Sequence, residues 1–150
     1  MEIYDLILKN GNVYIDNKNI QKVDIGIKSG IISFIGNLNY MQAREIINLK
    51  NLLVLPGCID SQVHFREPGL THKEDIESGT KGAILGGITS IFEMPNTVPM
   101  TTNKNAFEQK LKIAEQNDYC NYAFFIGASK ENYTNLKNLE LLPGCSGIKI

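Results

Sequence analysis

The sequence has few of the residues that mark a disulfide scaffold, a membrane protein or a nucleic-acid binder. Its 150 residues include 3 cysteines, an odd and widely spaced set, which argues against a disulfide framework and a structural zinc knuckle. The longest apolar runs, such as residues 52–55, are far shorter than the roughly 20 residues that cross a bilayer. The formal net charge of -1 gives no reason to expect a nucleic-acid or acidic membrane partner.

The composition is otherwise that of an ordinary globular protein. Hydrophobic residues make up 43% of the chain and charged residues 21%, which is enough to bury a core. The first residues, Met1–Asp5, lack the basic-then-apolar pattern of a secretory signal. We therefore expect a cytoplasmic protein.

Residues 1–50 are expected to form a small β-rich domain of short strands and tight turns. The apolar segment Ile3–Leu8 is followed by Asn10–Gly11, a dipeptide suited to a hairpin because both residues tolerate positive φ. A second tight turn is expected at Ser29–Gly30.

Residues 51–150 are expected to form an α/β domain. Leu52–Ile59 is an almost continuous apolar run, typical of a strand buried on both faces. Further candidate strands are Ile88–Phe92, Tyr122–Ile126 and Gly147–Ile150. Helical patterns separate them, and this alternation predicts a parallel sheet. The stretch has room for the first three to four βα units of an incomplete (β/α)₈ barrel, although a doubly wound sheet would give a similar pattern.

Local signals place the helices between these strands. Thr71 and Glu74 have the spacing of a capping box for the first helix, and Gly86–Gly87 is expected to end it. An apolar stripe predicts the second helix, with members Phe107, Leu111 and Ala114. A weaker third pattern covers residues 132–141.

Polar side chains follow the first strand of the α/β domain. Gln62, His64 and Arg66 are two residues apart, so on extended chain they point the same way. In α/β folds the carboxyl ends of strands hold the site. An amide, an imidazole and a guanidinium there indicate a metal ligand beside an anion clamp, and Asp60 is expected to orient its neighbours.

These residues resemble a known signature. The stretch Asp60-Ser61-Gln62-Val63-His64-Phe65-Arg66-Glu67-Pro68-Gly69 is similar to the D-x-H-x-H-x-R-E-P-G pattern of dihydroorotases, members of the amidohydrolase superfamily. Glu93-Met94-Pro95-Asn96-Thr97 and Gly86-Gly87-Ile88-Thr89 also look like that family. The β-rich start resembles the small sandwich domain that precedes such barrels, so the resemblance covers essentially the whole chain.

The resemblance implies reversible hydrolysis of dihydroorotate to carbamoyl aspartate, in pyrimidine biosynthesis, with one or two divalent metal ions, zinc being the first expectation. It implies that Arg66 and Asn96 hold the substrate carboxylate and that His64 binds metal. Lys149 matches a lysine that is carboxylated in many superfamily members and bridges two metals. Structural alternatives stay open: a salt bridge for Arg66, a turn for Asn96, a hydrogen-bonded imidazole for His64 and an ordinary exposed lysine for Lys149.

Gln62 departs from the family pattern, because it stands where the first metal-binding histidine is usual. An amide oxygen ligates divalent cations more weakly than imidazole, which zinc favours. The site could hold its metal less firmly, take another ligand, or have lost the metal. Gln62 is therefore a candidate ligand or a polar lining residue.

No residue of this stretch offers itself as the general base, which the resemblance assigns beyond residue 150, and the isolated chain is expected to be inactive. Two alternatives remain. One is a sibling enzyme such as dihydropyrimidinase or allantoinase. The other is a non-catalytic amidohydrolase-like scaffold that assembles with another pyrimidine-pathway enzyme. A homo-oligomer is a further expectation.

Overall fold

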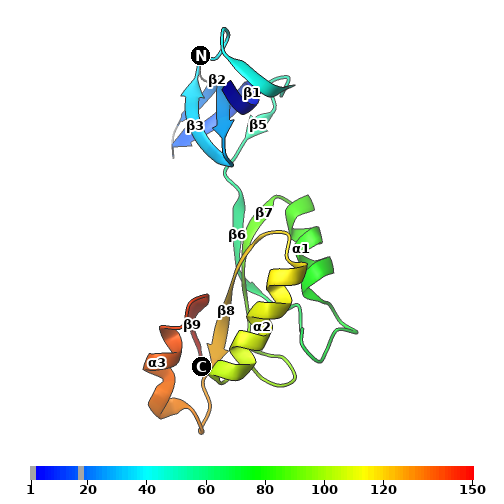
Figure 1. Cartoon of the computed structure of the whole chain (residues 1–150), viewed down its shortest axis with the longest axis vertical. Coiled ribbons are helices and arrows are strands. Elements are labelled where there is room, and N and C mark those ends of the chain that lie inside the picture. The colour runs from blue at the N-terminus through cyan, green and yellow to red at the C-terminus, as the bar shows by residue number, and fades with distance from the viewer. Residues whose placement is uncertain (1–2, 17–18) are drawn as a thin grey trace. The chain divides into compact units, whose positions relative to one another are not determined.

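The computed structural model describes residues 3–16 and 19–150, and the chain divides into two compact units, Met1–Pro56 and Gly57–Ile150. Figure 1 shows strands alone in the first unit and alternating strands and helices in the second. In the described ranges, no helix is long and apolar enough to cross a membrane.

The first unit is a five-stranded mixed sheet. Its central strand β1 pairs antiparallel with β2 and parallel with β4 and β5, and β3 is the neighbour of β2. The strands are β1 (Ile3–Asp16), β2 (Asn19–Lys28), β3 (Ile31–Gly36), β4 (Gln42–Asn48) and β5 (Leu53–Val54). The described residues of this unit form one sheet, and the sandwich-type domain expected from the sequence stays a prediction.

The two turns predicted in this unit have different outcomes. Ser29 and Gly30, with φ of 51° and 74°, connect β2 to β3 as expected of a primed hairpin turn. The hairpin at Asn10–Gly11 is wrong, because β1 continues through it with a break in register between Leu8 and Gly11. Asn10 has a φ of 58° and its N–H donates to Asp24 Oδ1 at 2.9 Å. The positive φ thus serves a bulge within a strand that is paired on both sides.

The single strand predicted over residues 52–59 is also wrong. Leu53–Val54 pairs with β1 in the first unit, whereas β6 (Cys58–Val63) opens the sheet of the second. Leu53 and Ile59 are 54% and 63% exposed. Pro56 and Gly57 separate the two strands, and Pro cannot donate a ladder hydrogen bond.

The second unit contains a four-stranded parallel sheet in the order β6-β7-β8-β9. Strands β7 (Ile88–Glu93), β8 (Asn121–Gly127) and β9 (Cys145–Lys149) alternate with three helices, α1 (Ile76–Leu85), α2 (Lys104–Asn117) and α3 (Leu136–Glu140). A short 3₁₀ turn, η1 (Tyr133–Asn135), precedes α3. The predicted α/β alternation is confirmed.

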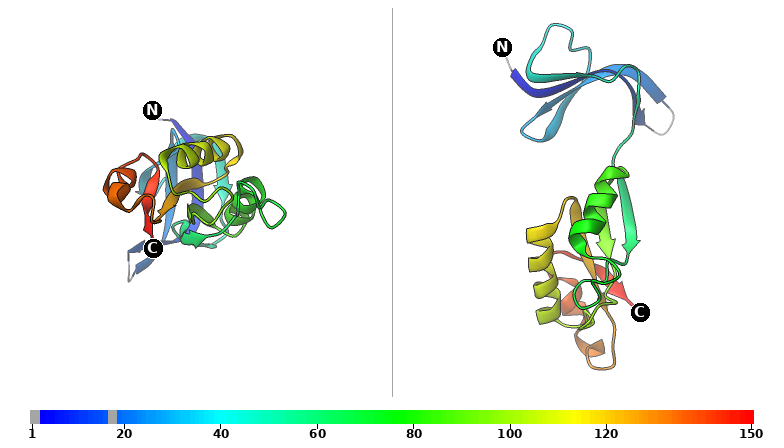
Figure 2. Two further views of the ribbon diagram at one scale, coloured as in Figure 1. Left: turned by 90° about the horizontal axis from the view of Figure 1, so that it is seen from below. Right: turned by 90° about the vertical axis from the view of Figure 1, so that its right-hand side faces the viewer.

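The core of this unit lies between the sheet and its helices, which Figure 2 shows on one side of the strands. Phe107 of α2 and Phe124 of β8 are almost fully buried, and their rings meet edge to face with centroids 6.5 Å apart. Ile76 of α1 and Leu139 of α3 belong to the same cluster. Side chains that alternate with these core residues on the strands therefore point to the opposite face of the sheet.

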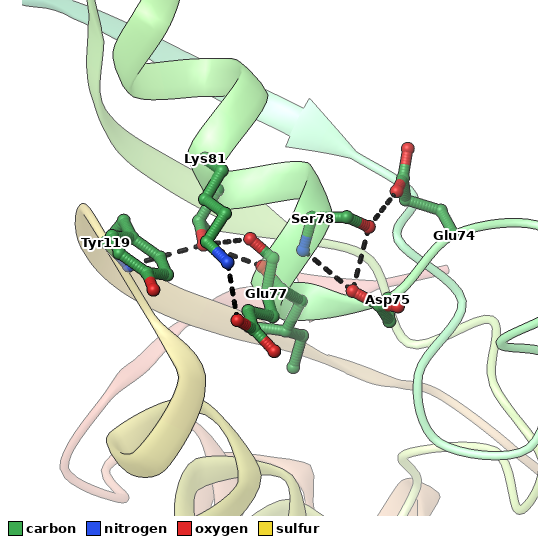
Figure 3. Close-up of polar contacts among 8 residues, drawn as sticks. Glu74, Asp75, Glu77, Ser78, Lys81 and Tyr119 are labelled. Carbon is green, nitrogen blue, oxygen red and sulfur yellow. Dashed lines mark hydrogen bonds and ion pairs between the residues drawn. The ribbon is translucent and has the colours of Figure 1, made fainter.

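Helix α1 begins four residues later than the sequence suggests. Its N-cap is Asp75, whose Oδ1 accepts from Ser78 N at 2.7 Å, so the capping box expected at Thr71 is wrong. Figure 3 shows the Ser78 hydroxyl between the carboxylates of Asp75 and Glu74. The cap ends the segment that runs from β6 to α1 at a defined point.

Candidate active site

The parallel strands end at one edge of the sheet. Val63 of β6 is in register with Glu93 of β7, and Gly127 of β8 with Lys149 of β9. Met94 N donates to Val63 O at 3.0 Å, so the segments that follow β6 and β7 leave the sheet side by side. In α/β folds this edge is the usual place for a substrate.

Arg66, Asn96 and Lys149 meet at this edge. Arg66 Nη1 donates to the backbone oxygen of Asn96 at 3.3 Å. Lys149 Nζ donates to Asn96 Oδ1 at 3.3 Å. Asn96 thus links a cation that follows β6 to a cation at the end of β9. Three of the residues predicted to form the site are brought together, although the Asn96 side chain contacts Lys149 and not the guanidinium.

The Arg66 backbone is held in an unusual conformation. Its φ of 72° lies in the left-handed region, which is uncommon for residues other than glycine. Arg66 N donates to Glu93 Oε1 at 3.2 Å, and the two loops are further joined by Val98 N, which donates to Pro68 O at 3.0 Å. The turn that carries Arg66 is therefore hydrogen-bonded to the end of β7.

His64 lies between Val63 and Phe65, which pack in the core beneath the helices. The His64 side chain therefore points away from this core, because side chains alternate along an extended segment. The buried Nδ1 atom has no hydrogen-bond partner among the described residues. Burial lowers the pKa of His64 below its usual value, and the positive charges of Arg66 and Lys149 lower it further. A neutral imidazole is thus favoured, the form that binds metals.

Gln62 and Asp60 lie within β6, before the edge of the sheet at which Arg66, Asn96 and Lys149 meet. Gln62 is exposed, and its backbone N–H donates to Asp60 Oδ1 at 3.0 Å. One oxygen of Asp60 is therefore bonded to the strand backbone.

A buried ion pair beneath the site was not predicted from the sequence. Glu93 ends β7 and Lys110 projects from α2, and the two side chains form an ion pair with 1% and 0% exposure. Lys110 Nζ also donates to Met94 O at 3.0 Å. Burial raises the pKa of Glu93 and lowers that of Lys110, and the pairing opposes both shifts. The only signal in the sequence is that Lys110 falls on the apolar stripe of its helix.

Comparison with known proteins identifies the family. A model of the amidohydrolase family matches residues 53–144, which is more than half of the chain. The chain belongs to the amidohydrolase family. A dihydroorotase from Methanothermobacter thermautotrophicus is 40% identical over 125 residues, covering 83% of this chain and 28% of that protein. An allantoinase from Salmonella choleraesuis is 40% identical over 113 residues, covering 75% of this chain and 24% of that protein.

Solved structures of amidohydrolase relatives share the fold. The L-hydantoinase (dihydropyrimidinase) from Arthrobacter aurescens superimposes with a TM-score of 0.89 at 30% identity, covering 97% of this chain and 32% of that one. A D-hydantoinase (dihydropyrimidinase) from Thermus sp. gives a TM-score of 0.73 at 27% identity, covering 89% of this chain and 30% of that one. The chain spans less than a third of the length of these relatives.

Amidohydrolases generally use a metal, and the residues of this stretch fit one part of a metal site. The unpartnered, buried Nδ1 of His64 suits a metal ligand, and Lys149 lies at the same edge. Among residues 3–16 and 19–150, no group of three or more His, Cys, Asp or Glu side chains could hold an ion. These residues could therefore contribute ligands to a metal without completing its coordination.

Proposed function

We propose that this stretch supplies the substrate-binding part of a dihydroorotase active site, in an enzyme that reversibly hydrolyses the cyclic amide of dihydroorotate. The observation that carries the proposal is the junction of Arg66, Asn96 and Lys149 beside His64. Two dihydroorotases at 38% and 40% identity over most of the chain support it. The reaction would serve pyrimidine biosynthesis.

In this proposal, Arg66 and Asn96 bind the carboxylate of the substrate. The planar guanidinium can donate two parallel hydrogen bonds to a carboxylate, and the second cation, Lys149, adds positive charge at the same edge. Holding the carboxylate fixes where the ring amide lies, and such positioning can remove a large part of a reaction barrier. Asn96 would exchange its contact with Lys149 for one with the substrate.

His64 is the proposed first metal ligand, with Gln62 and a carboxylated Lys149 as further candidates. A bound divalent ion, zinc before others, would polarise a carbonyl and make water a stronger nucleophile near neutral pH. His64 is suited to this role because it is held neutral. We assign the general base and the remaining ligands to residues outside this stretch, so the 150-residue chain by itself should not hydrolyse dihydroorotate.

The two domains would have separate parts in the enzyme. Residues 1–50 are proposed to belong to a small sandwich domain, and residues 51–150 to the first three to four βα units of a (β/α)₈ barrel. Chain coverage of 97% in the superposition on the L-hydantoinase is consistent with this assignment.

Ligand binding tests the proposal on the chain itself. Isothermal titration should detect dihydroorotate binding, and Arg66→Ala should weaken it at least about tenfold, because a charged hydrogen-bonding partner of the carboxylate is lost. Arg44→Ala is the matched control, since Arg44 is an exposed arginine of the first unit. Equal affinity of the Arg66→Ala variant and the parent chain would refute the carboxylate clamp.

A second candidate is a sibling activity on a neutral ring, as in allantoinase or dihydropyrimidinase. The allantoinase relative, which matches at the same 40% identity, favours it. Dihydrouracil lacks the carboxylate, so a dihydroorotase site should prefer dihydroorotate over both dihydrouracil and allantoin. Tighter binding of either neutral ligand would favour the sibling activity, and no binding of any of the three would favour a non-catalytic scaffold.

A further inference from the structure

Burying the ion pair between Glu93 and Lys110 carries an unfavourable desolvation free energy. Both side chains are almost completely shielded from solvent, and the desolvation of two charges often outweighs their mutual attraction. Apolar residues of similar size would stabilise such a position at least as well. The pair therefore calls for an explanation other than stability.

Each member of the pair has a second contact, and both contacts reach the loops of the candidate site. Glu93 Oε1 accepts the backbone N–H of Arg66 at 3.2 Å. Lys110 Nζ donates to the carbonyl of Met94 at 3.0 Å, two residues before Asn96. Helix α2 is thereby connected through charged hydrogen bonds to the turn of Arg66 and to the turn of Asn96.

The Arg66 turn needs such a connection. A left-handed φ of 72° at a residue with a side chain is unfavourable and persists only when surrounding contacts enforce it. A hydrogen bond to a carboxylate is stronger than one to a neutral acceptor. Glu93 supplies this acceptor, and the adjacent Lys110 opposes the effect of burial on the pKa of the Glu93 carboxyl.

We propose that Glu93 and Lys110 are positioning residues, which fix the turns of Arg66 and Asn96 against helix α2 and so set the spacing of the groups that bind the carboxylate. The part of this inference that concerns the ligand rests on the proposed function. The part that concerns the turns does not, because it can be measured without a ligand.

Hydrogen exchange tests the positioning directly. In the double variant Glu93→Gln with Lys110→Met, no lone charge is left buried. We expect the exchange rate of the Arg66 amide, divided by that of the Phe124 amide, to rise at least about tenfold. The Phe124 amide of β8 donates to the oxygen of Gly144, the residue before β9, at 2.9 Å, so the ratio corrects for a change in global stability. An unchanged ratio in the folded variant would overturn the proposal.

An exposed ion pair of the same helix provides the matched control. Lys104 and Glu108 lie 3.7 Å apart and are more than half exposed, and Glu108→Gln with Lys104→Met repeats the same two substitutions. This control should leave the ratio unchanged. If the buried double variant does not fold, Glu93→Gln with Lys110→Gln replaces it, because this pair of substitutions also leaves no lone charge buried. The ratio should then rise by a smaller factor, and no rise would count against the proposal.

Ligand binding separates this inference from the proposed function. If both hold, the buried double variant should bind dihydroorotate at least about fivefold more weakly than the parent chain, with less effect on dihydrouracil. If the parent chain binds neither compound, the proposed function fails, and the exchange ratio still decides whether the pair positions the turns. Unchanged dihydroorotate affinity in a variant with a raised ratio would refute the effect on the clamp.

Discussion

The His64 side chain favours the neutral form of its imidazole. Its Nδ1 is buried without a partner in the described part of the chain, and its pKa is lowered by burial and by Arg66 and Lys149. Buried polar atoms are nearly always hydrogen-bonded, so a buried Nδ1 atom without a partner needs an explanation. The proposed role of His64 as a metal ligand would account for it.

Metal affinity should therefore depend on His64 and not on His72, the other histidine of the chain. In a Zn²⁺ titration, His64→Asn should weaken the tightest site by at least about tenfold, since even the outer partners of metal ligands are worth that much. His72 is exposed, and His72→Asn should change nothing. Equal losses in both variants would indicate non-specific binding.

The reverse substitution at residue 62 tests whether that position faces the ion. Gln62→His restores the imidazole that is usual in this family and should tighten Zn²⁺ binding, because zinc prefers nitrogen over an amide oxygen. An unchanged affinity would place Gln62 outside the coordination sphere and leave it as polar lining.

Single residues of the candidate site were predictable to different degrees. His64 and Arg66 follow a strand, so their place at the sheet edge could be inferred from the order of elements. The contact of Lys149 with Asn96 could not, because it depends on how four strands align in space. The burial of Lys110 could not be foreseen either, since a lysine on a helix is exposed in most proteins.

Among the secondary-structure elements, regular ones were predicted better than irregular ones. The apolar stripe of α2 and the strands β7, β8 and β9 were expected near their observed bounds. Asn10–Gly11 was misassigned because a positive φ suits both a hairpin and a bulge, and only pairing across the whole sheet distinguishes them. Helix α1 begins at Ile76, because Asp75, four residues after Thr71, is itself a good N-cap residue and caps the helix.

The Asp75 side chain should stabilise helix α1 as its N-cap. Asp75→Ala should destabilise the chain by about 1 kcal/mol at neutral pH, measured by urea denaturation. Asp75→Ser, which keeps a capping oxygen, should cost less. Both measurements compare each variant with the parent chain under the same conditions.

The effect of Asp75→Ala should depend on pH. Bonds from the Ser78 backbone N–H and then from its hydroxyl lower the pKa of Asp75. A lowered folded-state pKa means that the stabilisation is complete above the unfolded pKa and is lost as the pH falls through the folded value. The difference between Asp75→Ala and the parent should therefore begin to shrink as the pH falls below about 3.9, the ordinary pKa of aspartate. A constant difference from pH 7 to pH 2 would contradict the role of the charge.

At the scale of the whole molecule, the chain consists of a mixed sheet and a parallel α/β unit. In the second unit the helices cover one face of the sheet, and Arg66, Asn96 and Lys149 meet at the carboxyl ends of the strands. The chain covers 28% of the dihydroorotase relative, and we propose that its residues bind substrate and metal while residues outside this stretch transfer the protons.

The most direct test of the central claim is an NMR titration of the ¹⁵N-labelled chain with dihydroorotate. The claim is that segments following different strands form one binding site for a carboxylate. The amide signals of Arg66, Asn96 and Lys149 should therefore shift together and give a single dissociation constant, and Arg66→Ala should raise that constant at least about tenfold for all three. Shifts confined to one segment, or centred at the other end of the sheet, would contradict the account.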